Sequence, residues 1–268
     1  MTRPIRSALA ALMLLGAGTS PLAQAAGVLR IAVNPIYPPL EFRDPITDAL
    51  TGFDIDFGNA LAKQMNMTPE WVETSFQQMI ASVQSGRTDM ILSGFSDMPQ
   101  RHALLDFMPY LLSGAQVLVL AGSSTSNAKD LCGQAVAASR ATSFPAIIRE
   151  WSRTNCEAQG RPAIIFYPSE SGADARIQLL QGRVAAMVQG RETVGYFMSI
   201  THNAFRRLGE PLSHMILAIG FAKTSPALRD KVQLAFEHLK NDGTYARLLR
   251  KWSLENDAII TTSDGSTP

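Results

Sequence analysis

The sequence has few cysteines, almost no excess of charge of either sign and, beyond its first 25 residues, no long apolar run. Its 24 Lys and Arg residues nearly balance its 23 Asp and Glu residues, so the formal net charge is +1. Nucleic-acid-binding domains usually carry a basic stripe, and we therefore expect no nucleic acid as a partner. With 46% hydrophobic residues over 268 positions, the chain can form one large core or two smaller ones.

The first 25 residues differ in composition from the rest of the chain. Arg3 and Arg6 precede a short apolar run at positions 8–15, and the small-residue sequence AQA follows at positions 23–25. This pattern is typical of a secretory signal peptide, which we predict is cleaved near Ala25. The apolar run is too short to cross a bilayer. A buried N-terminal helix is the competing interpretation, and the flanking charge disfavours it. We therefore expect an exported protein.

Only two cysteines occur, Cys132 and Cys156, separated by 24 positions. Because an exported chain enters an oxidising compartment, we predict that they form a disulfide. Closing a loop of this size stabilises the folded state by roughly 3 kcal/mol in the chain-entropy model. Two buried free thiols are the alternative. A metal site is disfavoured because no His stands at ligand spacing from either cysteine.

Strand and helix patterns alternate along most of the chain. In the first part we expect strands at 29–33, 71–73 and 89–92, with helices at 52–65 and 76–84. After an apolar strand at 117–120, a second alternation places strands at 135–138, 164–166 and 185–188, with helices at 144–154, 173–181 and 194–201. A strand at 215–221 and helices at 225–239 and 244–252 end the pattern. Such alternation is typical of parallel sheets covered by helices.

Two alternating units joined by two apolar crossings predict two α/β lobes. We assign residues 26–116 and 216–256 to the first lobe and residues 117–215 to the second, with a flexible tail at 257–268. Loops at the strand ends of both lobes then face one cleft, which is the usual ligand position in open α/β sheets.

Five short segments carry a family resemblance. They are YPPLEF at 37–42, GFDIDF at 52–57, SGRTD at 85–89, SGFSDMPQR at 93–101 and NDGTY at 241–245. In this order, between Leu29 and Trp252, they resemble the family 3 extracellular solute-binding proteins, the periplasmic receptors of polar amino-acid ABC transporters.

The resemblance implies a two-lobed periplasmic-binding-protein-like fold of the α/β class, with a two-stranded hinge and a ligand cleft between the lobes. In this family the lobes close on a ligand by hinge motion. The closed form docks on the membrane subunits of an ABC permease. We accordingly expect a monomer with a small-molecule ligand, and neither a cofactor nor a metal ion.

The same resemblance assigns a carboxylate site in the first lobe. Arg101 holds the position of the family arginine that grips the α-carboxylate, and a planar guanidinium forms two parallel bonds to a carboxylate. An exposed arginine in a surface turn is the alternative. Ser96 matches the serine that contacts the same head group. Gly94 matches the position whose carbonyl often accepts the ligand amine, and a plain turn glycine is compatible with that role.

Further positions complete the expected site. From the second lobe, Thr142 and Ser143 fall on the family turn whose N–H groups and hydroxyl bind the carboxylate. Tyr37 and Phe76 stand where the family places the walls around the ligand side chain. Core packing is the alternative for both.

One departure concerns the ligand amine. The family usually has an Asp for the α-ammonium where this chain has Gly190. An unpaired ammonium in a closed cleft is costly. Either Glu192 or Asp97 meets the amine of an amino acid, or the ligand is a carboxylate without an amine in that place.

Enzymatic activity is the remaining alternative. A few relatives of this fold are enzymes, including a cyclohexadienyl dehydratase and lytic transglycosylase modules. Glu192 is the one good candidate for a general acid or base. Ser93 and Ser96 have no His placed beside them by any motif. We therefore predict no catalytic residues, and a binding protein rather than an enzyme.

Overall fold

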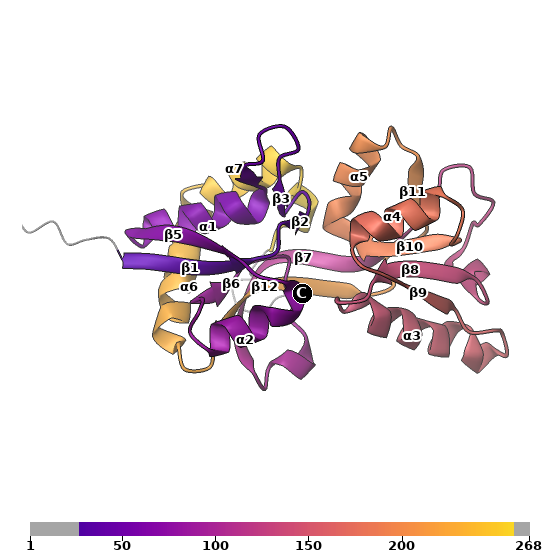
Figure 1. Ribbon diagram of the computed structural model, residues 1–268, viewed down its shortest axis with the longest axis horizontal. Coiled ribbons are helices and arrows are strands. Elements are labelled where there is room, and N and C mark those ends of the chain that lie inside the picture. The colour runs from indigo at the N-terminus through magenta and orange to yellow at the C-terminus, as the bar shows by residue number, and fades with distance from the viewer. Residues whose placement is uncertain (1–26, 260–268) are drawn as a thin grey trace, which may run out of the picture.

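In the computed structural model, which describes residues 27–259, the first lobe is built on a parallel sheet. Strand β1 (Gly27–Val33) pairs on one side with β5 (Met67–Glu73) and on the other with β6 (Met90–Ile91). Helices α1 (Phe53–Gln64) and α2 (Met79–Gln84) connect these strands. Two helices from the end of the chain, α6 (Pro226–Asn241) and α7 (Thr244–Trp252), return to this lobe (Figure 1).

The core of the first lobe is rich in aromatic rings. Phe53 and Phe57 lie one helical turn apart on α1, so both face inward. Both stack on Tyr110, at centroid distances of 6.3 and 5.6 Å. Phe236 and Tyr245 close the cluster edge-on. This packing holds the N-terminus of α1 against the strand that carries Tyr110.

The second lobe has its own sheet and its own core. Strand β8 (Ala135–Ser139) lies parallel to β9 (Ile165–Ser169) and to β10 (Ala186–Gly190), while β11 (Phe205–Arg207) lies at the margin. Helices α3 (Phe144–Asn155), α4 (Gly172–Leu180) and α5 (Val194–Ile200) cover it. Val117, Val136, Ile148 and Val188 are among its buried residues. Figure 1 shows this group of elements beside the first lobe.

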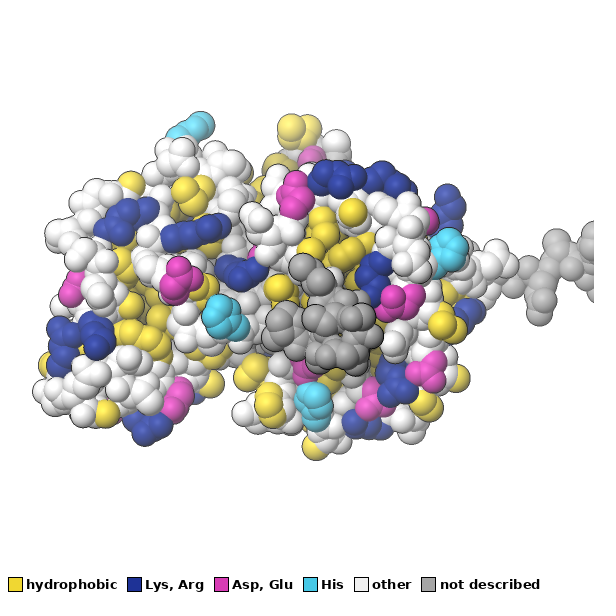
Figure 2. Space-filling view, turned by 180° about the vertical axis from the view of Figure 1, so that it is seen from behind, with side chains coloured by type: hydrophobic (Ala, Val, Ile, Leu, Met, Phe, Trp, Pro, Cys, Tyr) yellow, Lys and Arg dark blue, Asp and Glu magenta, His cyan; other side chains and the backbone are white. Residues whose placement is uncertain are grey.

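Two long antiparallel strands connect the lobes. Strand β7 (Leu105–Leu120) pairs with β12 (His214–Ala222) along its first part and with β10 and β11 beyond it. These strands form the predicted two-stranded hinge, and the expected fold class is confirmed. The strand expected only at 117–120 begins at Leu105, because pairing with β12 extends it through Asp106 and Ser113, which interrupt the apolar pattern. Seen from behind, the lobes carry interspersed basic and acidic side chains (Figure 2).

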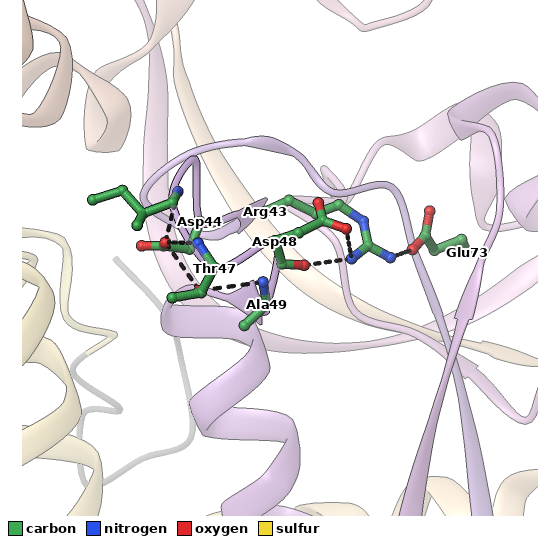
Figure 3. Close-up of polar contacts among 7 residues, drawn as sticks. Arg43, Asp44, Thr47, Asp48, Ala49 and Glu73 are labelled. Carbon is green, nitrogen blue, oxygen red and sulfur yellow. Dashed lines mark hydrogen bonds and ion pairs between the residues drawn. The ribbon is translucent and has the colours of Figure 1, made fainter.

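A small separate sheet lies beside the first lobe and was not expected from the sequence. It consists of β2 (Ile36–Tyr37), β3 (Glu41–Arg43) and β4 (Leu50–Thr51). Arg43 links it to β5, because its guanidinium bonds both the Asp48 carbonyl and the Glu73 carboxylate (Figure 3). In the loop between β3 and β4, Asp44 Oδ1 accepts the Thr47 N–H at 2.8 Å. The position of Tyr37 and Glu41 is therefore tied to the main sheet.

The predicted disulfide is confirmed. Cys132 and Cys156 are joined, with an S–S distance of 2.02 Å. The bond connects the segment that enters β8 to the C-terminal end of α3. Both elements belong to the second lobe, so the crosslink braces that lobe alone.

The sequence analysis made one prediction for each end of the chain. The predicted signal peptide lies outside the described residues. Of the tail predicted at 257–268, residues 257–259 pack against the body, and the remaining positions lie outside the described residues. Asp257 is buried and forms an ion pair with Arg191 at 2.7 Å, and the Ile259 N–H donates to Tyr245 Oη at 3.2 Å. Between residues 27 and 259, no helix combines the length and the apolar character needed to cross a membrane.

Candidate ligand-binding site

A cavity of about 250 Å³ is lined by residues of both lobes and of the hinge strands. Its wall is rich in uncharged polar side chains: Asn34, Ser75, Gln77, Ser93, Ser96, Ser113, Ser139, Thr142, Ser143, Ser171 and Gln189. The segments that follow β6, β8 and β9 supply many of these groups. They are the carboxyl ends of parallel strands, which explains why the chain turns there and why side chains converge.

Six of the eight predicted ligand residues line this one cavity. They are Tyr37, Phe76, Gly94, Ser96, Thr142 and Ser143. The other two, Arg101 and Glu192, lie behind the lining residues and do not form part of the wall. Tertiary structure therefore gathers positions from five separate segments, 37, 76, 94–96, 142–143 and 192, around one volume.

Arg101 is held behind Ser96. Its Nη1 donates to the Ser96 carbonyl at 2.7 Å, and its guanidinium lies 4.0 Å from the centre of the Phe95 ring and 5.8 Å from that of Phe76. Cation–π contact of this kind holds the planar group in place. Burial lowers the pKa of Arg101 to about 10, against the opposing attraction of Asp97. Within residues 27–259, Arg101 forms no ion pair.

Asp97 does not face the cavity. Its carboxylate pairs with His102, and both residues line a groove on another part of the surface. Glu192 and Asp97 were the two acidic residues predicted from the sequence to meet the ligand amine. In the structure, Glu192 lies beside the cavity and Asp97 does not.

Glu192 is 3% exposed and accepts two hydroxyl hydrogen bonds. Tyr37 Oη donates to Oε1 at 2.8 Å, and Ser113 Oγ donates to Oε2 at 2.6 Å. Burial raises the pKa of Glu192 to about 7, although both hydroxyl bonds oppose the shift. Since Tyr37 and Ser113 both line the cavity, the carboxylate acts on it through their hydroxyl groups.

The surroundings of Gly190 leave no room for a side chain. A Cβ atom at this position would lie 2.1 Å from Glu192 Oε1 and 2.2 Å from Tyr37 Oη, both far inside van der Waals contact. The Glu192–Tyr37 pair therefore occupies the space that a side chain at position 190 requires. A carboxylate lies two residues further along the chain, at Glu192 in the short helix Arg191–Thr193 that follows β10.

In the second lobe, Thr142 and Ser143 stand at the N-terminus of α3. Thr142 Oγ1 donates to the Ser139 carbonyl at 2.8 Å and accepts the Phe144 N–H at 3.3 Å. The helix that begins there has 12 residues and no side-chain cap. The Phe144 and Ala146 N–H groups already have acceptors and Pro145 has no N–H, so this N-terminus offers the cavity mainly the partial positive charge of the helix.

Some lining residues were not identified from the sequence. Glu41 and Ser93 lie within the YPPLEF and SGFSDMPQR motifs, so the motifs contained the signal. No motif pointed to Ser113 or Gln189, because these residues reach the cavity only through the pairing of β7 and β10. Gln189 is 1% exposed, and its amide has no protein hydrogen-bond partner in the described part of the chain.

An α/β fold of two lobes on a two-stranded hinge, with a polar cavity between them, defines the class of solute-binding proteins. The family of bacterial extracellular solute-binding proteins, family 3, matches residues 29–255, and the chain belongs to this family. The resemblance seen in the motifs is thereby confirmed.

Curated relatives bind amino acids. The arginine-binding protein ArgT of Corynebacterium glutamicum is 28% identical over 237 residues, covering 87% of this chain and 76% of the relative. The L-cystine-binding protein TcyJ of Escherichia coli K12 is 28% identical over 229 residues, covering 84% and 82%.

Solved structures show the same fold. An ancestral arginine-binding protein bound to arginine has a TM-score of 0.76 and 26% identity, covering 85% of this chain and 99% of the other. An ancestral amino-acid-binding protein described as a precursor of cyclohexadienyl dehydratase has a TM-score of 0.72 and 28% identity, covering 84% and 95%.

Proposed function

We propose that this chain captures an amino acid in the cavity, closes its lobes on it and delivers it to the permease of an ABC importer. One observation carries the proposal. Two groups of opposite charge stand directly behind the cavity wall, the partly buried Arg101 and the buried Glu192, and neither forms a salt bridge among residues 27–259. Buried charges are costly unless they are paired. A ligand with one carboxylate and one ammonium supplies both partners.

The carboxylate end of the ligand belongs beside Ser96 and Arg101. The guanidinium uses one N–H for the Ser96 carbonyl, which leaves further donors for a bidentate carboxylate contact. Thr142 and Ser143, at the N-terminus of α3, face the same cavity from the second lobe. Closure of the lobes then adds the partial positive charge of this helix N-terminus to that of the guanidinium.

The ammonium end belongs beside Tyr37. Because Tyr37 Oη donates its proton to Glu192, and one of its two lone pairs interacts with the Gly190 backbone, its second lone pair can accept from a ligand N–H. The negative charge of Glu192 strengthens that acceptor from behind. The Gly94 carbonyl, assigned to the amine by family position, is a second acceptor.

A ligand screen with matched pairs tests this proposal. Thermal unfolding of the purified protein is followed with each common amino acid and with the keto or hydroxy acid of the same skeleton. A ligand that binds only the folded state at 100 times its Kd stabilises it by about 2.7 kcal/mol. Amino acids should raise the unfolding temperature, and the matched acids should not. A response to the acids alone would instead identify a receptor for organic acids.

A dehydratase activity is the second candidate, since a carboxyl group with a pKa of about 7 suits a general acid. Against it, Glu192 lies behind Tyr37 and Ser113 and has no direct face on the cavity. Incubation with prephenate or arogenate decides between the two, because product formation would require an enzyme.

Export and assembly belong to the same proposal. We infer that residues 1–25 direct the chain to the periplasm and that it acts there as a monomer. We also infer that the lobes, residues 26–116 with 216–256 and residues 117–215, move about the middle of β7 and β12. The mass of the protein recovered from the periplasm tests the cleavage site near Ala25.

A further inference from the structure

Two buried carboxyl groups meet directly beneath the ligand cavity. Glu41, on β3, is 1% exposed and lines the cavity, and Asp54, the second residue of α1, is fully buried. Their side chains are in hydrogen-bonding contact with each other. Neither residue has a Lys, Arg or His partner among residues 27–259. Two adjacent carboxylates without a cation would repel strongly in such a place.

Two of the four carboxyl oxygens have donors. Glu41 Oε1 accepts from Ser93 Oγ at 2.8 Å. Asp54 Oδ2 accepts from the Gly94 N–H at 2.9 Å and from Tyr110 Oη at 2.9 Å.

The other two oxygens, Glu41 Oε2 and Asp54 Oδ1, are buried and have no donor in the described part of the chain. Buried polar atoms are rarely left unpaired, and each such atom is costly. A single proton between them satisfies both at once, as an O–H group on one residue that donates to the other.

The surroundings indicate which residue carries the proton. Asp54 accepts two donors and stands in the first turn of α1, where the helix dipole favours a negative charge. Glu41 accepts one hydroxyl only, and burial followed by the charge of Asp54 raises its pKa well above the usual range. The other titratable groups that face the pair are Glu192, whose charge acts in the same direction, and the neutral hydroxyl groups of Tyr37 and Tyr110.

We propose that Glu41 and Asp54 form an acid pair that holds one proton at neutral pH and thereby positions the ligand-contacting turn Ser93–Gly94. The pair fixes both residues of the turn, one through the Ser93 hydroxyl and one through the Gly94 N–H. Ser93 Oγ also accepts the Asn34 N–H at 3.0 Å. The one proton therefore joins three cavity-lining segments to each other and, through Tyr110, to the hinge strand β7. Its loss at alkaline pH leaves two facing carboxylates and loosens the turn.

Infrared spectroscopy of the ligand-free mature protein tests the proton directly. At about pH 8.5, Glu192 is largely ionised, because its pKa is about 7. The wild-type spectrum should still contain the C=O absorption of one protonated carboxyl group, and the Glu41→Gln variant should lack it. The Glu192→Gln variant is the matched control, and it should keep that absorption at this pH. An absence of the absorption in the wild-type protein would overturn the proposal.

A pair of variants tests the positioning role. In Glu41→Gln the amide NH₂ replaces the O–H donor to Asp54, so the folding equilibrium constant should stay within about threefold of wild type at neutral pH. In Asp54→Asn the amide oxygen can still accept from Gly94 and Tyr110, which both bond one oxygen of Asp54, but the NH₂ group then faces Glu41. Glu41 must give up its proton and hold a buried charge with fewer donors than Asp54 has, which should lower the constant about tenfold to a hundredfold. Equal losses in both variants would contradict the assignment of the proton to Glu41.

The amide signal of Gly94 provides a readout that a merely structural role would not move. In wild-type protein this ¹H–¹⁵N signal should shift as the pair loses its proton at alkaline pH. In Glu41→Gln it should stay constant, since no proton is left to lose. A titration of Gly94 that persists unchanged in the variant would show that another group controls the turn.

Discussion

The buried carboxyl of Glu192 makes the stability of the protein depend on pH, and Glu192→Gln should remove that dependence. The folded chain binds this proton more tightly than the unfolded chain, because the pKa rises from 4.5 to about 7. The contribution of Glu192 to the free energy of unfolding is therefore greatest below the unfolded pKa. It falls as the pH rises toward about 7 and is constant above that.

The magnitude follows from the size of the shift. One pKa unit corresponds to about 1.4 kcal/mol. Raising the pKa from 4.5 to about 7 thus corresponds to a loss of about 3 kcal/mol of unfolding free energy across that interval. Glutamine keeps the shape of the protonated side chain and an acceptor for Tyr37 Oη. The variant should accordingly equal or exceed wild type in stability at neutral pH.

Urea unfolding of both proteins between about pH 4.5 and pH 8.5 provides the measurement. The difference between the two curves isolates Glu192, because every other titrating group is common to both proteins. Wild type should lose stability relative to the variant as the pH rises. Parallel curves would show that the carboxyl group has an ordinary pKa, and the account of its burial would be wrong.

The same group should respond to ligand. An ammonium beside Tyr37 favours the ionised form of Glu192 and lowers its pKa. Binding of an amino acid near pH 7 should therefore release about half a proton, since Glu192 is half protonated at its own pKa of about 7. Calorimetry in buffers of different ionisation enthalpy measures this release. Glu192→Gln should show none, and equal release in both proteins would place the amine elsewhere.

Three further predictions concern other parts of the molecule. Arg101→Ala should weaken the binding of every carboxylate ligand by at least a hundredfold, because two charge-assisted hydrogen bonds are worth about 1.5–3 kcal/mol each. An undiminished rise in unfolding temperature with ligand would show that Arg101 does not bind the carboxylate. Gly190→Asp should reduce ligand affinity, because its Cβ would lie 2.1 Å from Glu192 Oε1. A gain in affinity, measured by calorimetry, would contradict the proposal that Glu192 rather than a residue at position 190 serves the ligand amine. Replacing Cys132 and Cys156 by serine should lower the free energy of urea unfolding by roughly 3 kcal/mol, and an unchanged value would show that the disulfide adds nothing.

Much of the fold could be read from periodicity. The strands at 29–33 and 135–138 and the helices at 144–154 and 244–252 were found within a few residues of their positions. The hinge strand β7 was underestimated, because its first part contains polar residues and Pro109, and its pairing with β12 decides its length. The small sheet β2–β4 was missed, since its strands are two or three residues long and show no period.

By itself, the sequence determined the family, the alternation of strands and helices, the pairing of its two cysteines and six residues of the cavity wall. These follow from local patterns and from motifs that are continuous along the chain. Only the tertiary structure decided where charge is held. It placed Glu192 in the space that a side chain at Gly190 would need, turned Asp97 toward His102, and brought Glu41 against Asp54. Charges in buried places depend on neighbours that are distant in the chain, and their pKa values are set by burial that no local pattern encodes.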